Sequence, residues 1–309
     1  MSTNSPSSVR VGFVGLGSMG AAMAANLLRA GFALTAFDVS REAIERVAAL
    51  GAVPAQSVTE LAHRSDVLVV AVVDDAQVRD VCLAEGGALA GLSAGSVLVI
   101  TSTIAPATHK LIARRAAAHG VVVMDAAMTG GSVGARDGSL TFFVGGPAHV
   151  LARITPVLDA MSRQIFHCGD VGAGAAVKII NNFLSIAHIL AAREALQLAA
   201  AAKIDPERLL TMINAGELGS SWATRNWERL RHQEATHSTG AAGYVAITKK
   251  DLDLVADFAR AAGVGAPIVR GLLADVAPTL EVTGLTGLTG DGGAADTGRS
   301  STPPAGTRG

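Results

Sequence analysis

The chain has 309 residues, and its 25 lysines and arginines against 26 aspartates and glutamates give a formal net charge of −1. This balance argues against the strongly basic surface typical of proteins that bind nucleic acid or an anionic membrane, so the expected partner is a small molecule. The two cysteines, the polar N-terminal stretch and the lack of about 20 uninterrupted apolar residues predict a reduced, cytoplasmic protein without a membrane-spanning helix.

Short runs of β-branched and aliphatic residues alternate with helix-length segments through the first half of the chain. The clearest runs cover residues 9–15, 33–38, 66–73, 96–101 and 121–126, and runs at 140–146 and 164–169 predict closing strands. This alternation predicts an α/β fold, a Rossmann-type doubly wound parallel sheet with helices on both faces. Helix boundaries are marked as well, by Ser40 and Gly51 for one helix and by Pro106 and Gly120 for another.

The second half of the chain has the pattern of helices alone. No glycine or proline interrupts residues 175–203, which predicts one long helix of roughly 40 Å. A second helix is expected to begin at Asp205 and Pro206 and to end at Gly216, and a third covers residues 244–263. The sequence therefore predicts an all-helical C-terminal domain joined to the sheet by a long helix.

Three regions follow from these patterns. Residues 1–170 are predicted to form a dinucleotide-binding domain, and residues 171–283 a helical domain for substrate binding and dimerisation. Residues 284–309 are rich in glycine, threonine and proline and almost without large apolar side chains. Such a segment cannot offset the entropy lost on ordering, so we predict a flexible tail.

A glycine-rich loop follows the first predicted strand. In the stretch GFVGLGSMGAAM, Gly15 permits a tight turn, Gly17 lets the backbone approach a pyrophosphate, and Gly20 lets the following helix pack against the strand. The N-terminus of that helix faces the negative charge of the phosphates. The residues expected to hold a dinucleotide cofactor here are Gly15, Leu16, Gly17, Ser18, Met19 and Gly20.

Asp38 lies at the end of the second predicted strand, where a carboxylate accepts hydrogen bonds from the ribose 2′-hydroxyl of NAD and repels the 2′-phosphate of NADP. The sequence thus predicts NAD as the cofactor. Arg41 could pair with a 2′-phosphate, which leaves NADP as the alternative, although its simpler interpretation is a solvated residue of the next helix. No metal site is expected, because the eight histidines are scattered and no CxxC motif is present.

A polar stripe lies on the predicted long helix, in the stretch GAGAAVKIINNFL. Lys178 and Asn182 share one face, with Asn181 and Ser185 beside them. The simplest interpretation is a lysine whose stem packs and whose head reaches water. A desolvated lysine beside a nicotinamide would instead have a pKa lowered toward neutrality and could exchange protons with a hydroxyl group. His188, about 80° around the helix from Lys178, is predicted to be a packing or interface residue.

Five motifs together resemble the β-hydroxyacid dehydrogenases, the family that contains 3-hydroxyisobutyrate dehydrogenase and tartronate semialdehyde reductase. They are GFVGLGSMGAAMAANL, TSTIAP, DAAMTGGSVGARDGSLTFFVGG, GAGAAVKIINN and KKDLDLV, in this order between residues 9 and 270. The resemblance implies that Lys178 is the catalytic general acid and base and that Asn182 orients the substrate. It further implies that the substrate carboxylate is held by Thr129, Gly130 and Gly131, and that the cofactor is contacted by Val72, Val73, Thr103 and Lys250.

The chain departs from the family pattern at two places. Ala127–Met128 stands where the family has Pro-Val, and Val72–Val73 replaces a Leu-Pro pair in the cofactor loop. The stretch GSSWATRNWERL resembles the threonate dehydrogenase branch, which implies that Trp222, with Asn226, could select a polyhydroxylated acid. The alternative is that Trp222 and Trp227 are core or interface residues.

The predicted function is NAD-dependent hydride transfer between a 3-hydroxy acid, of the 3-hydroxyisobutyrate, glycerate or threonate type, and the nicotinamide. The alternatives are an NADPH-dependent semialdehyde or imine reductase of the same architecture, and a catalytically inactive nucleotide-binding scaffold. A decarboxylating enzyme of the 6-phosphogluconate type would need a longer helical domain. The long helix leaves more apolar surface than a small domain can cover, so a homodimer or homotetramer is expected.

Overall fold

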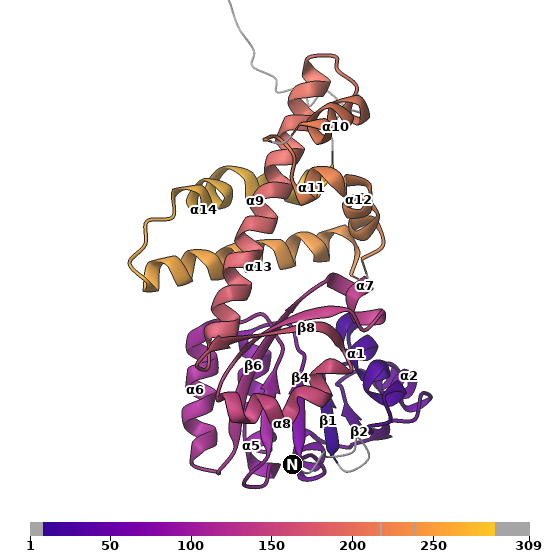
Figure 1. Ribbon diagram of the computed structural model, residues 1–309, viewed down its shortest axis with the longest axis vertical. Coiled ribbons are helices and arrows are strands. Elements are labelled where there is room, and N and C mark those ends of the chain that lie inside the picture. The colour runs from indigo at the N-terminus through magenta and orange to yellow at the C-terminus, as the bar shows by residue number, and fades with distance from the viewer. Residues whose placement is uncertain (1–8, 217, 238, 288–309) are drawn as a thin grey trace, which may run out of the picture.

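The computed structural model describes residues 9–216, 218–237 and 239–287. Figure 1 shows a sheet domain, coloured indigo to magenta, and a helical domain, coloured orange to yellow, with the long helix α9 (Ala173–Ala201) running from one into the other. The predicted arrangement of a Rossmann-type sheet followed by a helical region is confirmed. The exact domain boundary stays a prediction, and the last strand before α9 ends at Gly169.

One eight-stranded sheet, in the order β3-β2-β1-β4-β5-β6-β7-β8, forms the N-terminal domain. The chain adds strands on one side of β1 up to β3 and then on the other side from β4 onward, so the strand order changes between β1 and β4. In open α/β sheets, ligands bind outside the carboxyl ends of the strands at such a point. The strands are β1 (Arg10–Val14), β2 (Ala33–Phe37), β3 (Val53–Pro54), β4 (Val67–Val70), β5 (Val97–Ile100), β6 (Val122–Thr129), β7 (Leu140–Gly145) and β8 (Ser162–Gly169).

Both faces of this sheet are buried. Along β1, Val11 and Phe13 belong to the hydrophobic cluster on one face, whereas Val14 belongs to the cluster on the other. Strand β4 alternates in the same way, with Val69 on the first face and Leu68 on the second. Because successive side chains of a strand point to opposite faces, continuous apolar runs are needed here, and this explains why the strands were visible in the sequence.

Eight helices connect the strands and cover these faces. Ser40 accepts a hydrogen bond from the Ala43 N–H at the start of α2, and Pro106 occupies the first turn of α6, as predicted. The helices are α1 (Ser18–Arg29), α2 (Arg41–Ala48), α3 (Val58–His63), α4 (Asp75–Leu83), α5 (Ala88–Gly91), α6 (Pro106–Ala117), α7 (Gly131–Arg136) and α8 (Ala148–Asp159).

Two features of the sheet were absent from the sequence prediction. Strand β3 has two residues at the sheet edge and is too short to give a periodic pattern. Strand β7 runs antiparallel to β6, whereas all other neighbouring pairs are parallel. The connection 130–139 is shorter than the dozen or so residues that a parallel crossover needs, so the chain must turn back.

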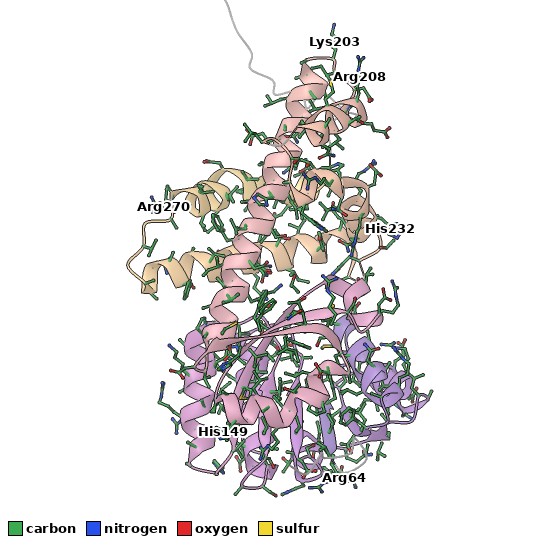
Figure 2. The ribbon with its side chains drawn as sticks, in the orientation of Figure 1. Arg64, His149, Lys203, Arg208, His232 and Arg270 are labelled. Atoms are coloured by element: carbon green, nitrogen blue, oxygen red, sulfur yellow. The ribbon has the colours of Figure 1, made fainter. Side chains whose placement is uncertain are left out.

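The helical domain contains the long helices α9 and α13, which cross in Figure 1. Trp227 and Leu252 lie in its core, so one of the two tryptophans is a core residue. Figure 2 shows Lys203 and Arg208 at the end of this domain farthest from the sheet. Besides α9 its helices are α10 (Pro206–Ala215), α11 (Trp222–Arg225), α12 (Trp227–Ala235), α13 (Gly240–Ala261), α14 (Pro267–Gly271), the π-helical turn η2 (Leu272–Val276) and α15 (Ala277–Thr283).

The first residues of the predicted tail are packed against the helical domain. The buried Glu234 carboxylate accepts hydrogen bonds from the N–H groups of Leu285 (2.5 Å) and Thr286 (2.8 Å), and the Leu285 side chain is buried. A carboxylate that receives two backbone N–H groups holds a chain segment well, since hydrogen bonds to a charged acceptor are strong. The rest of the predicted tail, 288–309, lies outside the described residues.

Within the described part of the chain, α9 is long and apolar enough to cross a membrane by length and composition. From the sequence, no membrane-spanning helix was expected, because about 20 uninterrupted apolar residues are lacking. In the structure α9 packs against β6, β7, β8 and α13, and it carries Lys178 and two asparagines. We interpret it as a core helix, and the cellular compartment stays a prediction.

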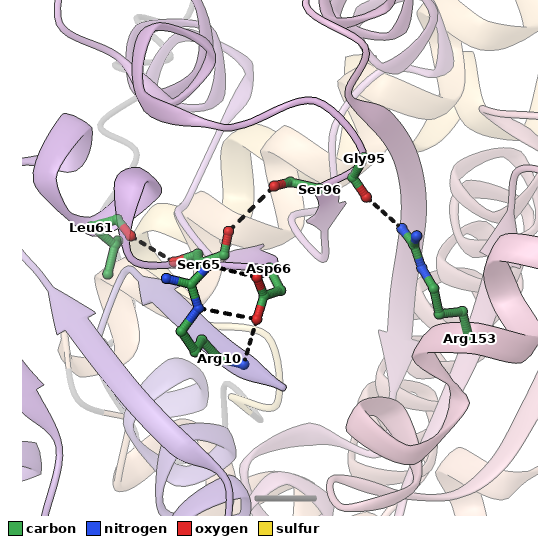
Figure 3. Close-up of polar contacts among 7 residues, drawn as sticks. All are labelled: Arg10, Leu61, Ser65, Asp66, Gly95, Ser96 and Arg153. Carbon is green, nitrogen blue, oxygen red and sulfur yellow. Dashed lines mark hydrogen bonds and ion pairs between the residues drawn. The ribbon is translucent and has the colours of Figure 1, made fainter. Parts of the chain in front are cut away.

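The amino ends of the strands are held together by polar contacts (Figure 3). The Arg10 guanidinium donates to both oxygens of Asp66, at 2.7 and 3.2 Å, and this hydrogen bond lowers the pKa of Asp66. Nearby, Arg153 donates to the Gly95 carbonyl at 2.9 Å. Arg10 and Asp66 neutralise each other here, and the candidate site lies at the opposite, carboxyl ends of the strands.

Candidate active site

The start of α9 is held by a buried carboxylate on the sheet. Asp125 of β6 is fully buried, and its two oxygens accept the N–H groups of Gly172 (2.6 Å) and Ala175 (2.8 Å). The first N–H groups of a helix have no partner within the helix, so Asp125 serves as a cap from a distant strand. This contact fixes α9 on the carboxyl ends of the strands and places Lys178 in its second turn.

A cavity of about 770 Å³ opens between the sheet, α9 and the short helices of the C-terminal domain. It is lined by all six residues that the sequence analysis assigned to catalysis and substrate binding. Trp222 is half exposed, unlike the buried Trp227. The six residues are Thr129, Gly130, Gly131, Lys178, Asn182 and Trp222. The structure thus brings them to one cavity, while their individual roles stay predictions.

The amine of Lys178 is poorly hydrated. Its pKa is lowered from 10.5 to about 8, chiefly by burial; the Asp251 carboxylate raises this pKa, and the positive charge of Lys250 lowers it. Desolvation is the largest of these effects because it disfavours the charged amine. Both the neutral and the protonated amine are therefore populated within about one pH unit of 8, as a group that accepts and donates protons requires.

Asp251 of α13 organises the polar groups around Lys178. Its Oδ2 accepts a hydrogen bond from Asn182 Nδ2 at 2.7 Å, and its Oδ1 forms a 3.1 Å ion pair with Lys250 Nζ. Asp251 was not predicted from the sequence, although it lies in the quoted KKDLDLV motif directly after Lys250. Its role depends on Asn182, which is remote in sequence and becomes its neighbour only when α9 and α13 pack.

Two charge-removing substitutions should move the pKa of Lys178 in opposite directions. Asp251→Asn removes the charge that raises this pKa, so the pH at which turnover is half-maximal should fall. Lys250→Met removes the charge that lowers it, so the same midpoint should rise. The measurement is kcat against pH at saturating substrate and cofactor. Shifts in the same direction, or none, would show that a different group controls the profile.

The glycine loop has the geometry of a phosphate cradle. Gly15 adopts φ of 92°, a left-handed conformation that favours glycine. A Cβ at Gly20 would collide with the Gly15 carbonyl, whereas a Cβ at Gly17 would meet nothing within 4 Å. The close packing at Gly20 and the open space at Gly17 fit the roles expected of a dinucleotide-binding loop. Helix α1 begins here without a side-chain cap, so its first N–H groups are available to a ligand.

Asp38 lies beside this loop. Its carboxylate accepts hydrogen bonds from the Leu16 N–H at 2.5 Å and from the Ser40 N–H at 2.7 Å. These bonds fix its direction, and each oxygen keeps a further lone pair for a ribose hydroxyl. Arg41 is highly exposed and pairs with Glu45 at 2.8 Å. The arrangement favours the interpretation of Arg41 as a solvated helix residue.

Lys250 joins the two domains at the remaining cofactor loops. Its Nζ donates to the carbonyls of Val73 (3.3 Å) and Thr103 (3.1 Å), which follow β4 and β5. The Val72 N–H donates to Ser102 Oγ at 3.0 Å, which ties the two loops together. The residues assigned to the cofactor by resemblance therefore lie together at the carboxyl ends of adjacent strands.

Two further polar residues were singled out in the sequence. His188 is exposed and lines the cavity, which extends along α9 well beyond Lys178, so it is not a packing residue, while its position at an interface stays a prediction. Asn226 donates to the Trp222 carbonyl at 2.9 Å and does not line this cavity. Among the residues that the structure describes, no group of three or more histidine, cysteine or acidic side chains could hold a metal ion.

Two family profiles match consecutive parts of the chain. Residues 10–169 match the NAD-binding domain of 6-phosphogluconate dehydrogenase, and residues 172–279 match the NAD-binding domain of NADP-dependent 3-hydroxyisobutyrate dehydrogenase. The two matches meet between β8 and α9. They cover the glycine loop and the lysine helix respectively.

Several characterised proteins are similar over most of their length. A 3-hydroxyisobutyrate dehydrogenase of Pseudomonas aeruginosa is 37% identical over 262 residues, 84% of this chain and 88% of that protein. An L-threonate dehydrogenase of Cupriavidus necator is 36% identical over 251 residues, 81% and 83% of the two chains. A crystal structure of a 3-hydroxyisobutyrate dehydrogenase from Salmonella typhimurium superposes with a TM-score of 0.75 at 36% identity, covering 86% of this chain and 92% of that one.

Proposed function

The chain belongs to the β-hydroxyacid dehydrogenase family and is an NAD(P)-dependent oxidoreductase, and from this premise we propose that it uses NAD to oxidise a 3-hydroxy acid, with Lys178 as the proton acceptor. The observation that carries the proposal is the lowered pKa of Lys178 in a cavity that it shares with Thr129, Gly130 and Gly131. The reverse reaction, on the semialdehyde, uses the same groups.

Each residue has a distinct task in the proposed reaction. The Thr129 hydroxyl and the amides of Gly130 and Gly131 bind the substrate carboxylate. Asp251 accepts one of the two Nδ2 hydrogens of Asn182, and the second is left to donate to the oxygen of the substrate hydroxyl. The neutral amine of Lys178 takes the hydroxyl proton during oxidation and returns it during reduction. A bound nicotinamide supplies the hydride acceptor.

The electrostatics of Lys178 oppose the alternative of an inactive scaffold. Lowering the pKa of a lysine from 10.5 to about 8 corresponds to roughly 3 kcal/mol of lost preference for the charged form. A scaffold that only holds a nucleotide has no use for this loss. A simple imine, the substrate of an imine reductase, would also fit the cavity. The Thr129–Gly131 segment is better suited to a carboxylate, which such an imine lacks.

A substrate screen tests the proposal. Purified protein with NAD or NADP should oxidise at least one of 3-hydroxyisobutyrate, serine, glycerate and threonate. It should leave 4-hydroxybutyrate unchanged, because moving the hydroxyl one carbon away from the carboxylate takes it out of reach of Lys178. If the protein binds NAD but neither oxidises any of these acids nor reduces their semialdehydes, the inactive scaffold is favoured instead.

We further propose that α9 packs against a second copy of the chain. Ile180, Leu184 and Leu198 are 50, 50 and 65% exposed and, with the exposed Ala191, lie within about 40° of one another on the helix. An exposed apolar stripe of this length is typical of a subunit interface. Sedimentation should give a dimer or larger, and Leu198→Asp should weaken it, whereas Val282→Asp, at an 89% exposed residue of α15, should not. A monomeric wild type would contradict this arrangement.

A further inference from the structure

The cavity extends well beyond the groups that the proposed reaction needs. Its volume of about 770 Å³ lies within the range of roughly 300–1,000 Å³ that holds drug-sized ligands. A four-carbon hydroxy acid bound between Lys178 and Thr129 would leave much of this space to the substituent of the acid. The remaining wall therefore decides which substituent fits.

That wall is positively charged. Arg163 of β8 and Arg229 of α12 line the cavity together with Lys178, and no aspartate or glutamate among residues 9–216, 218–237 and 239–287 lines it. Neither arginine has an ion pair within the described part of the chain, whereas Arg231, two residues beyond Arg229, pairs with Glu228 at 3.1 Å. Both side chains are exposed at this cavity, where each guanidinium presents several N–H donors in a fixed plane to an anion.

The sheet contributes a second, independent observation. Thr129 pairs with Thr141 on the neighbouring strand, and the ladder between β7 and β8 shifts register at this point, so that Leu140 pairs with Ser162 and Thr141 with Gln164. Arg163 is thus the extra residue of a β-bulge. Bulges commonly redirect a side chain beside an active site. Two strand spacings, about 10 Å, separate the backbones of β6 and β8, so Arg163 reaches the cavity from a part of the sheet distant from Thr129.

We propose that the substrate is a 3-hydroxy acid with a second anionic group, a carboxylate or a phosphate-type oxyanion, which Arg163 and Arg229 bind at the end remote from the reacting hydroxyl. This inference rests on the proposed function, because it assigns the first carboxylate to Thr129, Gly130 and Gly131. A polyhydroxylated neutral substituent would leave both guanidinium groups without a partner.

The test compares substrates that differ only in the charge of the remote group. The probes are 2-(hydroxymethyl)glutarate, its analogue with the remote carboxylate replaced by a carboxamide, and its analogue with a phosphonate there. Wild-type kcat/KM should be about 10-fold or more higher for both charged probes than for the amide, mainly through KM, because hydrogen bonds between ions are stronger than neutral ones. A preference for only one charged probe identifies the kind of anion and still supports the site.

Matched variants locate the effect. Arg163→Gln and Arg229→Gln should reduce the preference for the charged probes and leave kcat/KM for the amide nearly unchanged. Arg231→Gln lies on the same helix outside this cavity and should keep the wild-type preference. Equal wild-type values for charged and neutral probes, or losses of equal size on all probes in the two cavity variants, would overturn the inference.

A binding measurement separates this inference from the proposed function. If no hydroxy acid is oxidised, the proposed function fails, and the site is judged by calorimetric binding of glutarate against glutaramate to the protein holding NAD. Tighter binding of glutarate that is lost in Arg163→Gln would retain the anion site without the reaction. Equal binding of the two compounds would remove the site as well.

Discussion

Replacing Lys178 with alanine is expected to lower kcat by about 10²–10⁴-fold, the usual contribution of a positioned general acid or base. The physical reason is the lowered pKa, about 8, which lets this amine accept and donate a proton near neutral pH, as the proposed reaction requires. The affinity for NAD should change little, because the glycine loop and Asp38 lie on other elements. The measurements are steady-state turnover and NAD binding by fluorescence titration.

Three controls separate loss of the amine from loss of structure. Lys249→Ala removes a lysine of α13 that pairs with Glu281 on the surface, and this variant should retain wild-type turnover. Lys178→Arg keeps a positive charge that cannot be released, so it should be as slow as the alanine variant. Added methylamine should restore part of the activity of Lys178→Ala. Wild-type turnover in Lys178→Ala would show that another group carries the proton.

Replacing Asp38 with alanine should give the second-largest change, a fall in the ratio of kcat/KM for NAD over NADP by about 10–100-fold. The substitution removes acceptors for the ribose hydroxyls and the negative charge that repels a 2′-phosphate, and each charge-assisted hydrogen bond contributes about 1.5–3 kcal/mol. The measurement is kcat/KM for both cofactors with the best acid from the screen. A wild-type protein that prefers NADP would contradict the assignment of Asp38.

Asp38 also supports the loop that it faces, so its removal needs a matched control. Asp38→Asn removes the charge but keeps one oxygen acceptor, so it retains one of the two hydrogen bonds that Leu16 and Ser40 donate to separate carboxylate oxygens in the wild type. Glu45→Gln frees Arg41 from its ion pair and leaves the loop intact. If this variant alone improves NADP use, Arg41 is the residue that limits the cofactor choice. If it does not, the preference depends on Asp38.

The parts of the fold that depend on local sequence could be predicted. The alternating strands, the glycine loop and the polar stripe around Lys178 each lie within a short window, and periodicity or spacing shows them. The antiparallel direction of β7 depends on how much chain is available to cross the sheet, and an apolar run does not specify it. The short helices α11 and α12 were missed because WATR and WERLRHQEA offer too little apolar periodicity.

The residues that position the site were harder to find than those that form it. Asp125 is an acidic residue inside an apolar strand, and its partners Gly172 and Ala175 lie far along the chain. Asp251 is similar, because it acts on Asn182 from a different helix. Arg163 depends on a register shift between two strands. Each of these residues acts through tertiary packing, which a single sequence does not display.

One strand sets the spacing between the two ends of the proposed reaction. Asp125, near the middle of β6, holds the helix that carries Lys178, and the same strand ends at Thr129. The proposed proton carrier and the proposed carboxylate-binding residue are thus both held by β6. A substitution at Asp125 would therefore displace Lys178 relative to Thr129 without touching either residue.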